Sequence, residues 1–172
     1  MTISALAASF AVLLFPLAMV YAGVMDLVTM KIRNVLVLAI GAVWLILAPL
    51  AGFTVTELGL NIALALLVFA ITFTFFVLGW IGGGDAKLAA VTALWFDPQQ
   101  ALAYFTYASL LGGLLTLAII QFRTMMLPSV LVRVPWIMQL HGKKAGVPYG
   151  AAMAPAALIV FPETAWVAHA AF

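Results

Sequence analysis

The chain has 172 residues, of which 67% are hydrophobic and only 7% are charged, and its mean hydropathy is +1.27. In soluble domains about a quarter of the residues are charged, so the composition excludes an ordinary soluble domain and indicates an integral membrane protein. The net charge of +2 is a small excess of Lys and Arg and suggests no nucleic-acid partner, and the lack of cysteine excludes disulfides and thiolate metal sites.

A chain of this length has room for about six short membrane spans, so we expect a single domain over residues 1–172. The stretch 2–25 lacks a basic N-terminal region, and the first basic residues, Lys31 and Arg33, come after it. This order favours a retained helix with its N-terminus outside over a cleaved secretion signal. Apolar runs between polar, Gly or Pro residues predict an all-α polytopic membrane protein. The predicted helices cover about 3–25, 34–51, 58–80, 86–96, 100–121 and 148–168.

The charged residues fix the expected orientation of these six spans. If the spans cross the bilayer alternately, every basic residue falls on one side, and Glu57, Asp97 and Glu163 fall on the other. The basic side should be cytoplasmic, which predicts a protein of the cytoplasmic membrane. Without the marginal span at 86–96, the last four basic residues would lie outside, so the charges favour six spans. The basic residues are Lys31, Arg33, Lys87, Arg123, Arg133, Lys143 and Lys144.

The stretch 123–146 is more polar than the predicted spans and contains two prolines. Within it, residues 125–140 are mainly apolar but are interrupted by Pro128, Arg133 and Pro135. This pattern indicates an interfacial helix or a loop on the cytoplasmic surface. The alternative is a connector with no role beyond topology.

Two of the five acidic residues, Asp26 and Asp85, each follow an apolar run of roughly 20 residues, the length of a membrane span. An aspartate at a helix centre costs about 2.5–3.5 kcal/mol to insert, so intramembrane carboxylates usually mark functional sites. The predicted topology brings both to the cytoplasmic face, where they can form a catalytic pair. One carboxylate would keep a proton and act as the acid, while the other activates water against a peptide carbonyl.

This chemistry requires neither a nucleophilic Ser or Cys nor a metal or other cofactor. His141 and His169 are far apart in the sequence and form no helical metal-binding pair with a carboxylate, so we expect no metal site. For Asp26 the alternative is a helix-end residue that is solvated or paired with Lys31 or Arg33.

The glycine run Gly82-Gly83-Gly84 directly precedes Asp85. Glycine destabilises helices and allows another backbone or a substrate to approach closely, and irregular backbone at membrane depth is tolerated where it lines a cavity. The alternative is a flexible turn in which Asp85 caps the following helix.

Gly82-Gly83-Gly84-Asp85 resembles the GxGD pattern of membrane aspartic peptidases, and with Lys87 added it is similar to the type IV prepilin peptidases. In that family an Ile-Pro pair and an Asn follow the first aspartate. Here Ile32-Arg33-Asn34 keeps the Asn and replaces the Pro. The segment Pro148-Tyr149-Gly150 resembles the Pro-aromatic-Gly motif that opens the family's last helix.

The resemblance implies an aspartic endopeptidase that cuts the leader from type IV prepilins at the cytoplasmic membrane face. Its substrate would have a short basic leader followed by an apolar helix in the bilayer. The resemblance also implies roles for individual residues. They are Asp26 and Asp85 as the catalytic pair, and Gly82, Gly84, Lys87, Asn34, Pro148, Tyr149 and Gly150 in the motifs or in substrate positioning.

The larger, bifunctional members of the family carry a zinc-binding domain between their first two helices and also N-methylate the new terminus. Only eight residues separate Asp26 from Val35 here, so we expect a peptidase without that domain and doubt the methylation. The size resembles that of the compact peptidases of Flp/Tad pilus systems and of archaeal preflagellin peptidases.

Other readings of the same residues stay open at this point. Lys87 orients a carboxylate or is an interfacial lysine that extends towards water. Asn34 binds a substrate backbone or caps the second helix. Residues 148–150 form a helix start with an aromatic anchor at the interface. At the level of function, the rivals are a small proton- or ion-coupled transporter or channel and a non-catalytic component of a pilus machine.

Overall fold

The computed structural model describes residues 2–142 and 145–170, and within these ranges the chain is helical and has no strand. The all-α prediction is therefore confirmed. The elements are α1 (Ile3–Thr29), α2 (Asn34–Leu50), α3 (Val55–Val77), α4 (Gly83–Ala93), α5 (Pro98–Thr124), α6 (Ser129–Val132), α7 (Pro135–His141), α8 (Gly150–Val160), the 3-10 helix η1 (Phe161–Glu163) and α9 (Ala165–Ala170).

Three of the helices, α1, α3 and α5, are long and apolar enough to cross a membrane. The 27 residues of α1 extend for about 40 Å, more than the roughly 30 Å of a bilayer's hydrocarbon core. Helix α2 and the segment Gly150–Glu163 are shorter apolar helices. Helix α4 has only 11 residues and extends for about 16 Å, so it reaches through half of that core.

The last predicted helix, 148–168, is wrong as one continuous element. Helix α8 ends at Val160, and η1 and α9 follow as separate pieces. Pro162 lacks the N–H that an α-helix would need at this point. Thr164 then adopts an extended conformation, and its hydroxyl donates to the Phe161 carbonyl oxygen at 2.7 Å. These two residues divide the predicted span.

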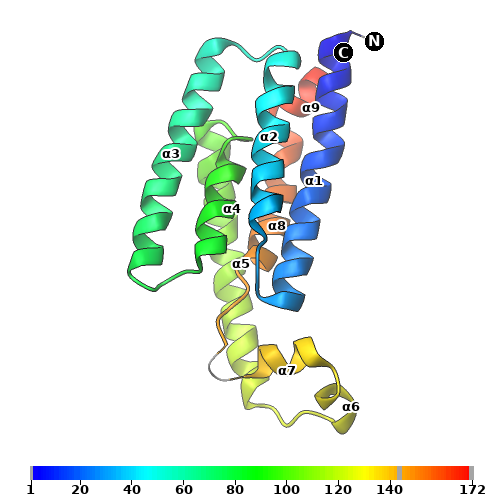
Figure 1. The fold of residues 1–172 in the computed structure, drawn as a ribbon, viewed down its shortest axis with the longest axis vertical. Coiled ribbons are helices and arrows are strands. Elements are labelled where there is room, and N and C mark those ends of the chain that lie inside the picture. The colour runs from blue at the N-terminus through cyan, green and yellow to red at the C-terminus, as the bar shows by residue number, and fades with distance from the viewer. Residues whose placement is uncertain (1, 143–144, 171–172) are drawn as a thin grey trace.

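Helices α1 to α5 run alternately up and down, as predicted, with the α1–α2 and α3–α4 connections at the same end of the bundle (Figure 1). Helix α1 packs against α2, α8 and α9, while α5 packs against α8. Helix α3 packs mainly on α4 and forms the outer edge of the bundle in Figure 1. At the opposite end, the Gln100 side chain donates to the Glu163 carbonyl oxygen at 2.9 Å and joins α5 to η1.

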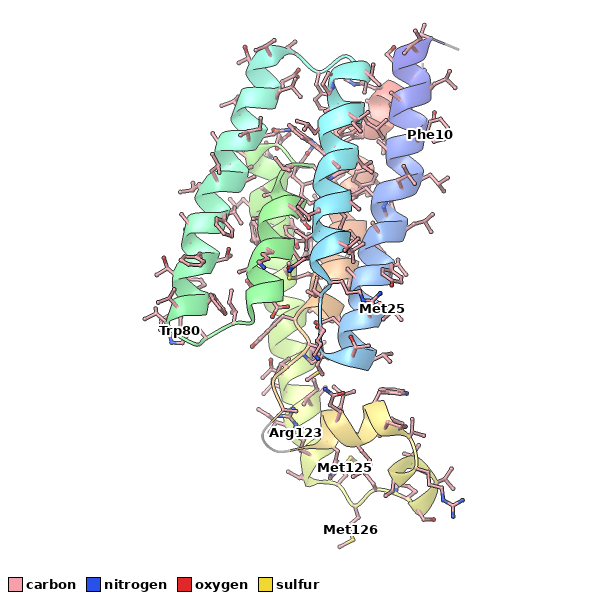
Figure 2. All side chains as sticks on the ribbon, in the orientation of Figure 1. Phe10, Met25, Trp80, Arg123, Met125 and Met126 are labelled. Atoms are coloured by element: carbon pink, nitrogen blue, oxygen red, sulfur yellow. The ribbon has the colours of Figure 1, made fainter. Side chains whose placement is uncertain are left out.

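An aromatic cluster fills the core at that opposite end. Phe15 lies 4.6 Å from Trp95 and 4.7 Å from Phe161 between ring centroids, and Trp95 lies 4.9 Å from Trp166. All four side chains are buried. Large apolar side chains such as Phe10 and Trp80 instead project from the bundle (Figure 2) and are exposed. Apolar exposure on this scale suits a surface in contact with lipid.

The segment after α5 forms two short helices, α6 and α7, beyond the end of the bundle (Figure 1). The guanidinium of Arg123 donates to the carbonyl oxygens of Leu140, Ala145 and Gly146, each at 2.8 Å. This arginine therefore fixes the chain that leads from α7 into α8. Two of the basic residues used for the orientation, Lys143 and Lys144, lie outside the described residues.

Candidate functional site

Asp26 lies inside the last turn of α1, because this helix continues to Thr29 and does not end near residue 25 as predicted. Met30 terminates the helix in a left-handed conformation, with its N–H donating to the Asp26 carbonyl oxygen at 2.8 Å. The Asp26 side chain is 4% exposed. Its Oδ2 accepts a 2.8 Å hydrogen bond from the backbone N–H of Gly150, the first residue of α8. The reading of Asp26 as a solvated helix-end residue is therefore wrong.

Two glycines allow α1 and α8 to approach closely at this carboxylate. A Cβ at Gly150 would lie 2.8 Å from Oδ2 of Asp26, and a Cβ at Gly23 would lie 2.7 Å from Cβ of Ala154 on α8. Gly23 was missed by the sequence reasoning. Its signal was its position three residues before Asp26, which places it on the same helix face.

Asp85 is the third residue of α4, and Gly82 is the N-cap. Oδ2 of Asp85 accepts a hydrogen bond of 3.2 Å from the Gly82 N–H, so the carboxylate reaches back to satisfy one of the free donors at the helix start. The prediction of Asp85 as the N-cap itself is therefore wrong by three positions.

The glycines before Asp85 are required by close contacts. A Cβ at Gly82 would lie 2.8 Å from Oδ2 of Asp85, and a Cβ at Gly84 would lie 3.1 Å from Cβ of Ile32, in the α1–α2 connection. At Gly83 it would lie 3.1 Å from the ring of Phe76. The glycine run thus lets the start of α4 pack against the end of α3 and the α1–α2 connection, and this keeps Asp85 near Asp26.

Asp26 and Asp85 line the same two cavities, of about 360 and 440 Å³. Trp80, Pro148 and Tyr149 also line the first cavity, while Arg33 and Asn34 line the second. Residues of the α1–α2 and α3–α4 connections line both cavities, and these two connections lie at the same end of the bundle (Figure 1).

Asn34 and Lys87 contact each other beside the site. Lys87 Nζ donates to Asn34 Oδ1 at 3.0 Å and so joins the second turn of α4 to the first residue of α2. The N-cap of α2 is Arg33, which makes no capping hydrogen bond through its side chain. The capping reading of Asn34 is therefore wrong, because its side-chain oxygen accepts from the lysine.

The segment Pro148-Tyr149-Gly150 leads into α8, as predicted: Tyr149 is the N-cap and Gly150 is the first helical residue. The Tyr149 ring packs against Gly112 of α5, where a Cβ would lie 3.3 Å from its Cδ1. This side chain also lines a cavity shared with Asp85. The three residues thus form the start of α8, and Pro148 and Tyr149 also line the candidate site.

The two histidines take no part in this arrangement. His141 lies on α7, where its Nε2 is 3.0 Å from the Met125 carbonyl oxygen, and His169 lies against Phe53 near the opposite end. Among residues 2–142 and 145–170, no cluster of three or more His, Cys, Asp or Glu side chains could hold a metal ion.

Comparison with known protein families gives a match over much of the chain. The sequence model described as the type IV leader peptidase family, Peptidase_A24, matches residues 13–117, which is more than half of the chain. The matched range contains Asp26, Asn34, Asp85 and Lys87. Searches of curated proteins and of solved structures returned no match. On the strength of the family match, this chain belongs to the type IV leader peptidase family.

Proposed function

We propose that the protein is a membrane-embedded aspartic endopeptidase that removes the leader peptide from type IV prepilins of the Flp kind. Its catalytic residues are Asp26 and Asp85. The observation that carries this proposal is that two carboxylates from separate helices, 59 positions apart in the chain (85 minus 26), line the same cavities. Family membership supports a leader peptidase, and the carboxylate pair supports the aspartic mechanism.

The pair performs the hydrolysis by general acid–base catalysis. The ionised carboxylate removes a proton from a water molecule as this water attacks the peptide carbonyl, and the protonated carboxyl donates a hydrogen bond to the carbonyl oxygen. The tetrahedral intermediate then collapses as the leaving amine receives a proton from the pair. Because the two groups share one proton and titrate as a unit, the proton belongs to the pair.

The backbone supports this chemistry by orienting both carboxylates. The Gly150 N–H holds Asp26, and the Gly82 N–H holds Asp85. Each donor lies at the start of a short helix, where the first N–H groups have no partner within the helix. The remaining oxygen atoms of the pair are left for water and the scissile peptide.

In this mechanism the basic leader of the substrate lies in the cytoplasm and its apolar helix lies in the bilayer. In the proposed orientation, the chain crosses the cytoplasmic membrane six times with its N-terminus outside, and the cavities at Asp26 and Asp85 face the cytoplasm. The leader junction then lies at the depth of the pair. The short connection from Met30 to Arg33 leaves no inserted domain between α1 and α2, so we do not propose a methyltransferase activity.

The direct test is to incubate the detergent-solubilised protein with a purified Flp-type pilin precursor and identify the products by mass spectrometry. We expect a single cut between the basic leader and the apolar segment, and no cut with the Asp85→Asn variant. A transporter, a channel or a non-catalytic assembly component would leave the precursor intact in both reactions. That outcome with the wild-type protein would refute the proposed function.

A further inference from the structure

A groove with a volume of about 280 Å³ runs between α3 and α5, with α4 and α8 as its floor. Its lining is mostly apolar and includes Phe75 on α3, Ala89 on α4, Ser109 and Gly112 on α5, and Met153 on α8. Phe75 and Ser109 are exposed, whereas Ala89, Gly112 and Met153 are buried. The groove therefore reaches from the surface of the bundle, through apolar walls, to a buried floor.

This groove adjoins the candidate active site. Ile81, Asp85 and Tyr149 line both the groove and the cavity of about 360 Å³ that also contains Asp26. Asp85 therefore lies between the mostly apolar groove and the more polar cavity. Tyr149 stands at the same junction and packs against Gly112 in the groove.

The arrangement of the helices leaves this side of the bundle open. Helix α3 packs mainly on α4, and α5 packs mainly on α8, so α3 and α5 flank the groove as separate walls. The small side chain of Ser109 on its exposed rim would let an apolar helix lie close to the backbone of α5, as small residues do at helix contacts in membranes.

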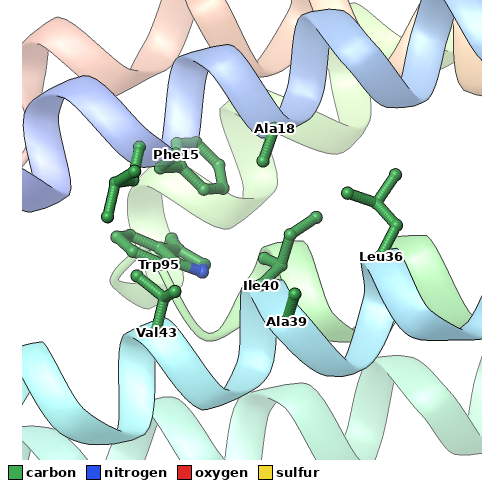
Figure 3. Close-up of a pocket in the computed structure, with 8 residues that line it drawn as sticks. Phe15, Ala18, Leu36, Ala39, Ile40, Val43 and Trp95 are labelled. Carbon is green, nitrogen blue, oxygen red and sulfur yellow. The ribbon is translucent and has the colours of Figure 1, made fainter.

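A second apolar cavity among the described residues shares no lining residue with the two cavities at Asp26 and Asp85. It has a volume of about 170 Å³ and lies between α1 and α2, where Phe15 and Trp95 face Ile40 and Val43 (Figure 3). No carboxylate lines it, and it adjoins the aromatic cluster at the end of the bundle opposite the site. An apolar segment bound there would place no peptide bond at Asp85.

We propose that the groove between α3 and α5 is the docking surface for the apolar segment of the precursor, which enters it sideways from the lipid. This inference rests on the proposed function. The occupant is identified by comparing the polarity of the precursor with the polarity of the residues that line the groove and the cavity. A prepilin changes from an apolar helix to a basic leader at the scissile junction, and the lining changes from apolar to polar at Asp85. When the apolar segment fills the groove, the junction lies beside the pair and the leader lies in the polar cavity.

Photo-crosslinking tests the location of the bound segment without requiring cleavage. A photoreactive benzoylphenylalanine replaces Ser109 in the Asp85→Asn background, and the matched control replaces the neighbouring Leu110, which is 66% exposed and does not line the groove. With a purified precursor in the same membranes, we expect an adduct from position 109 to the apolar segment of the precursor. An adduct from position 110 but not from position 109 would overturn the proposal.

Cleavage kinetics separate the groove from the catalytic pair. Ser109→Trp should fill the groove and lower the rate on the full precursor by roughly tenfold or more, mainly through KM, because the apolar segment loses its space. A short soluble peptide that spans the junction does not need the groove and should be cut at the wild-type rate. Leu110→Trp should leave both rates unchanged. Wild-type cleavage of the full precursor by Ser109→Trp would contradict the docking surface, whereas failure of the wild-type protein on both substrates would contradict the peptidase function itself.

Discussion

The backbone N–H of Gly150 donates a hydrogen bond of 2.8 Å to Oδ2 of Asp26, although the two residues are 124 positions apart in the chain. This contact joins the end of α1 to the start of α8. It also explains why residue 150 is a glycine, because a Cβ there would lie 2.8 Å from the same carboxylate oxygen. The start of α8 therefore orients one of the two proposed catalytic groups.

Replacing Gly150 by Ala should abolish or strongly reduce precursor cleavage, because the new methyl group must displace the Asp26 carboxylate or separate α1 from α8. Forced overpacking of this kind costs about 1–3 kcal/mol, so the variant should also unfold at lower temperature. A matched control is Gly59→Ala on α3, where a Cβ would meet no atom within 4 Å. The control should cleave normally and gain about 0.5–1 kcal/mol of helix stability. Equal activity of the two variants would show that the Gly150 contact has no role.

The hydrogen bond between Lys87 and Asn34 should contribute to the alignment of α4 with α2. We expect Lys87→Met and Asn34→Ala to lower the cleavage rate by similar factors, and the double variant to lose little more than either single variant. A coupling free energy of about 1 kcal/mol in this double-mutant cycle would match one hydrogen bond. Asn34→Asp keeps an oxygen acceptor and should retain most of the activity. Losses that simply multiply in the double variant would mean that the two side chains act separately.

The proposed orientation can be checked with single cysteines, because the natural chain contains none. Val55 at the start of α3 is 86% exposed and lies at the predicted outer end, and Met126 beyond α5 is 99% exposed at the predicted cytoplasmic end. A membrane-impermeant maleimide should label the Val55→Cys variant in intact cells and the Met126→Cys variant only after lysis. The opposite pattern would place the carboxylate pair on the outer face.

The cleavage rate should pass through a maximum as the pH is varied. At low pH both carboxyl groups are protonated and no base is available to activate water. At high pH both are ionised and no acid remains to polarise the carbonyl or protonate the leaving amine. Initial rates with the short junction peptide, measured over the range in which the protein stays folded, test this expectation. A rate that rises with pH and then stays constant would indicate a single carboxylate acting only as a base.

Much of this arrangement could be predicted from the sequence, because a membrane protein must bury long apolar segments and separates its charges by side. These constraints predicted most of the helices, their alternating order and the placement of Asp26 and Asp85 at the same end of the bundle. Helix ends were less accurate: local hydrogen bonding extends α1 to Thr29 and makes Gly82 the N-cap of α4.

Contacts between distant segments could not be predicted in the same way. The position of Gly23 on the helix face of Asp26 is a local signal, but it does not identify α8 as the neighbouring helix, since that approach depends on the packing of both helices. Pro162 and Thr164 are both residue types that disfavour a helix interior, and so they gave a signal for the break. The apolar run around them nevertheless favoured one continuous span. Arg123 was used only as a charge for the orientation, and its role in holding the chain before α8 appears only in three dimensions.

The central claim is that Asp26 and Asp85 together cut the precursor, and isosteric replacement of each carboxylate tests it most directly. Cleavage of a labelled Flp-type precursor is measured in membranes that contain equal amounts of the wild-type protein, Asp26→Asn, Asp85→Asn or the control Asp97→Asn. Asp97 is also an aspartate at a helix start, but it caps α5 at the opposite end of the bundle. Each of the first two variants should lose activity by about 10²–10⁴-fold or more while still inserting into the membrane, and the control should cleave at nearly the wild-type rate. Full processing of the precursor by either Asp26→Asn or Asp85→Asn would contradict the mechanism.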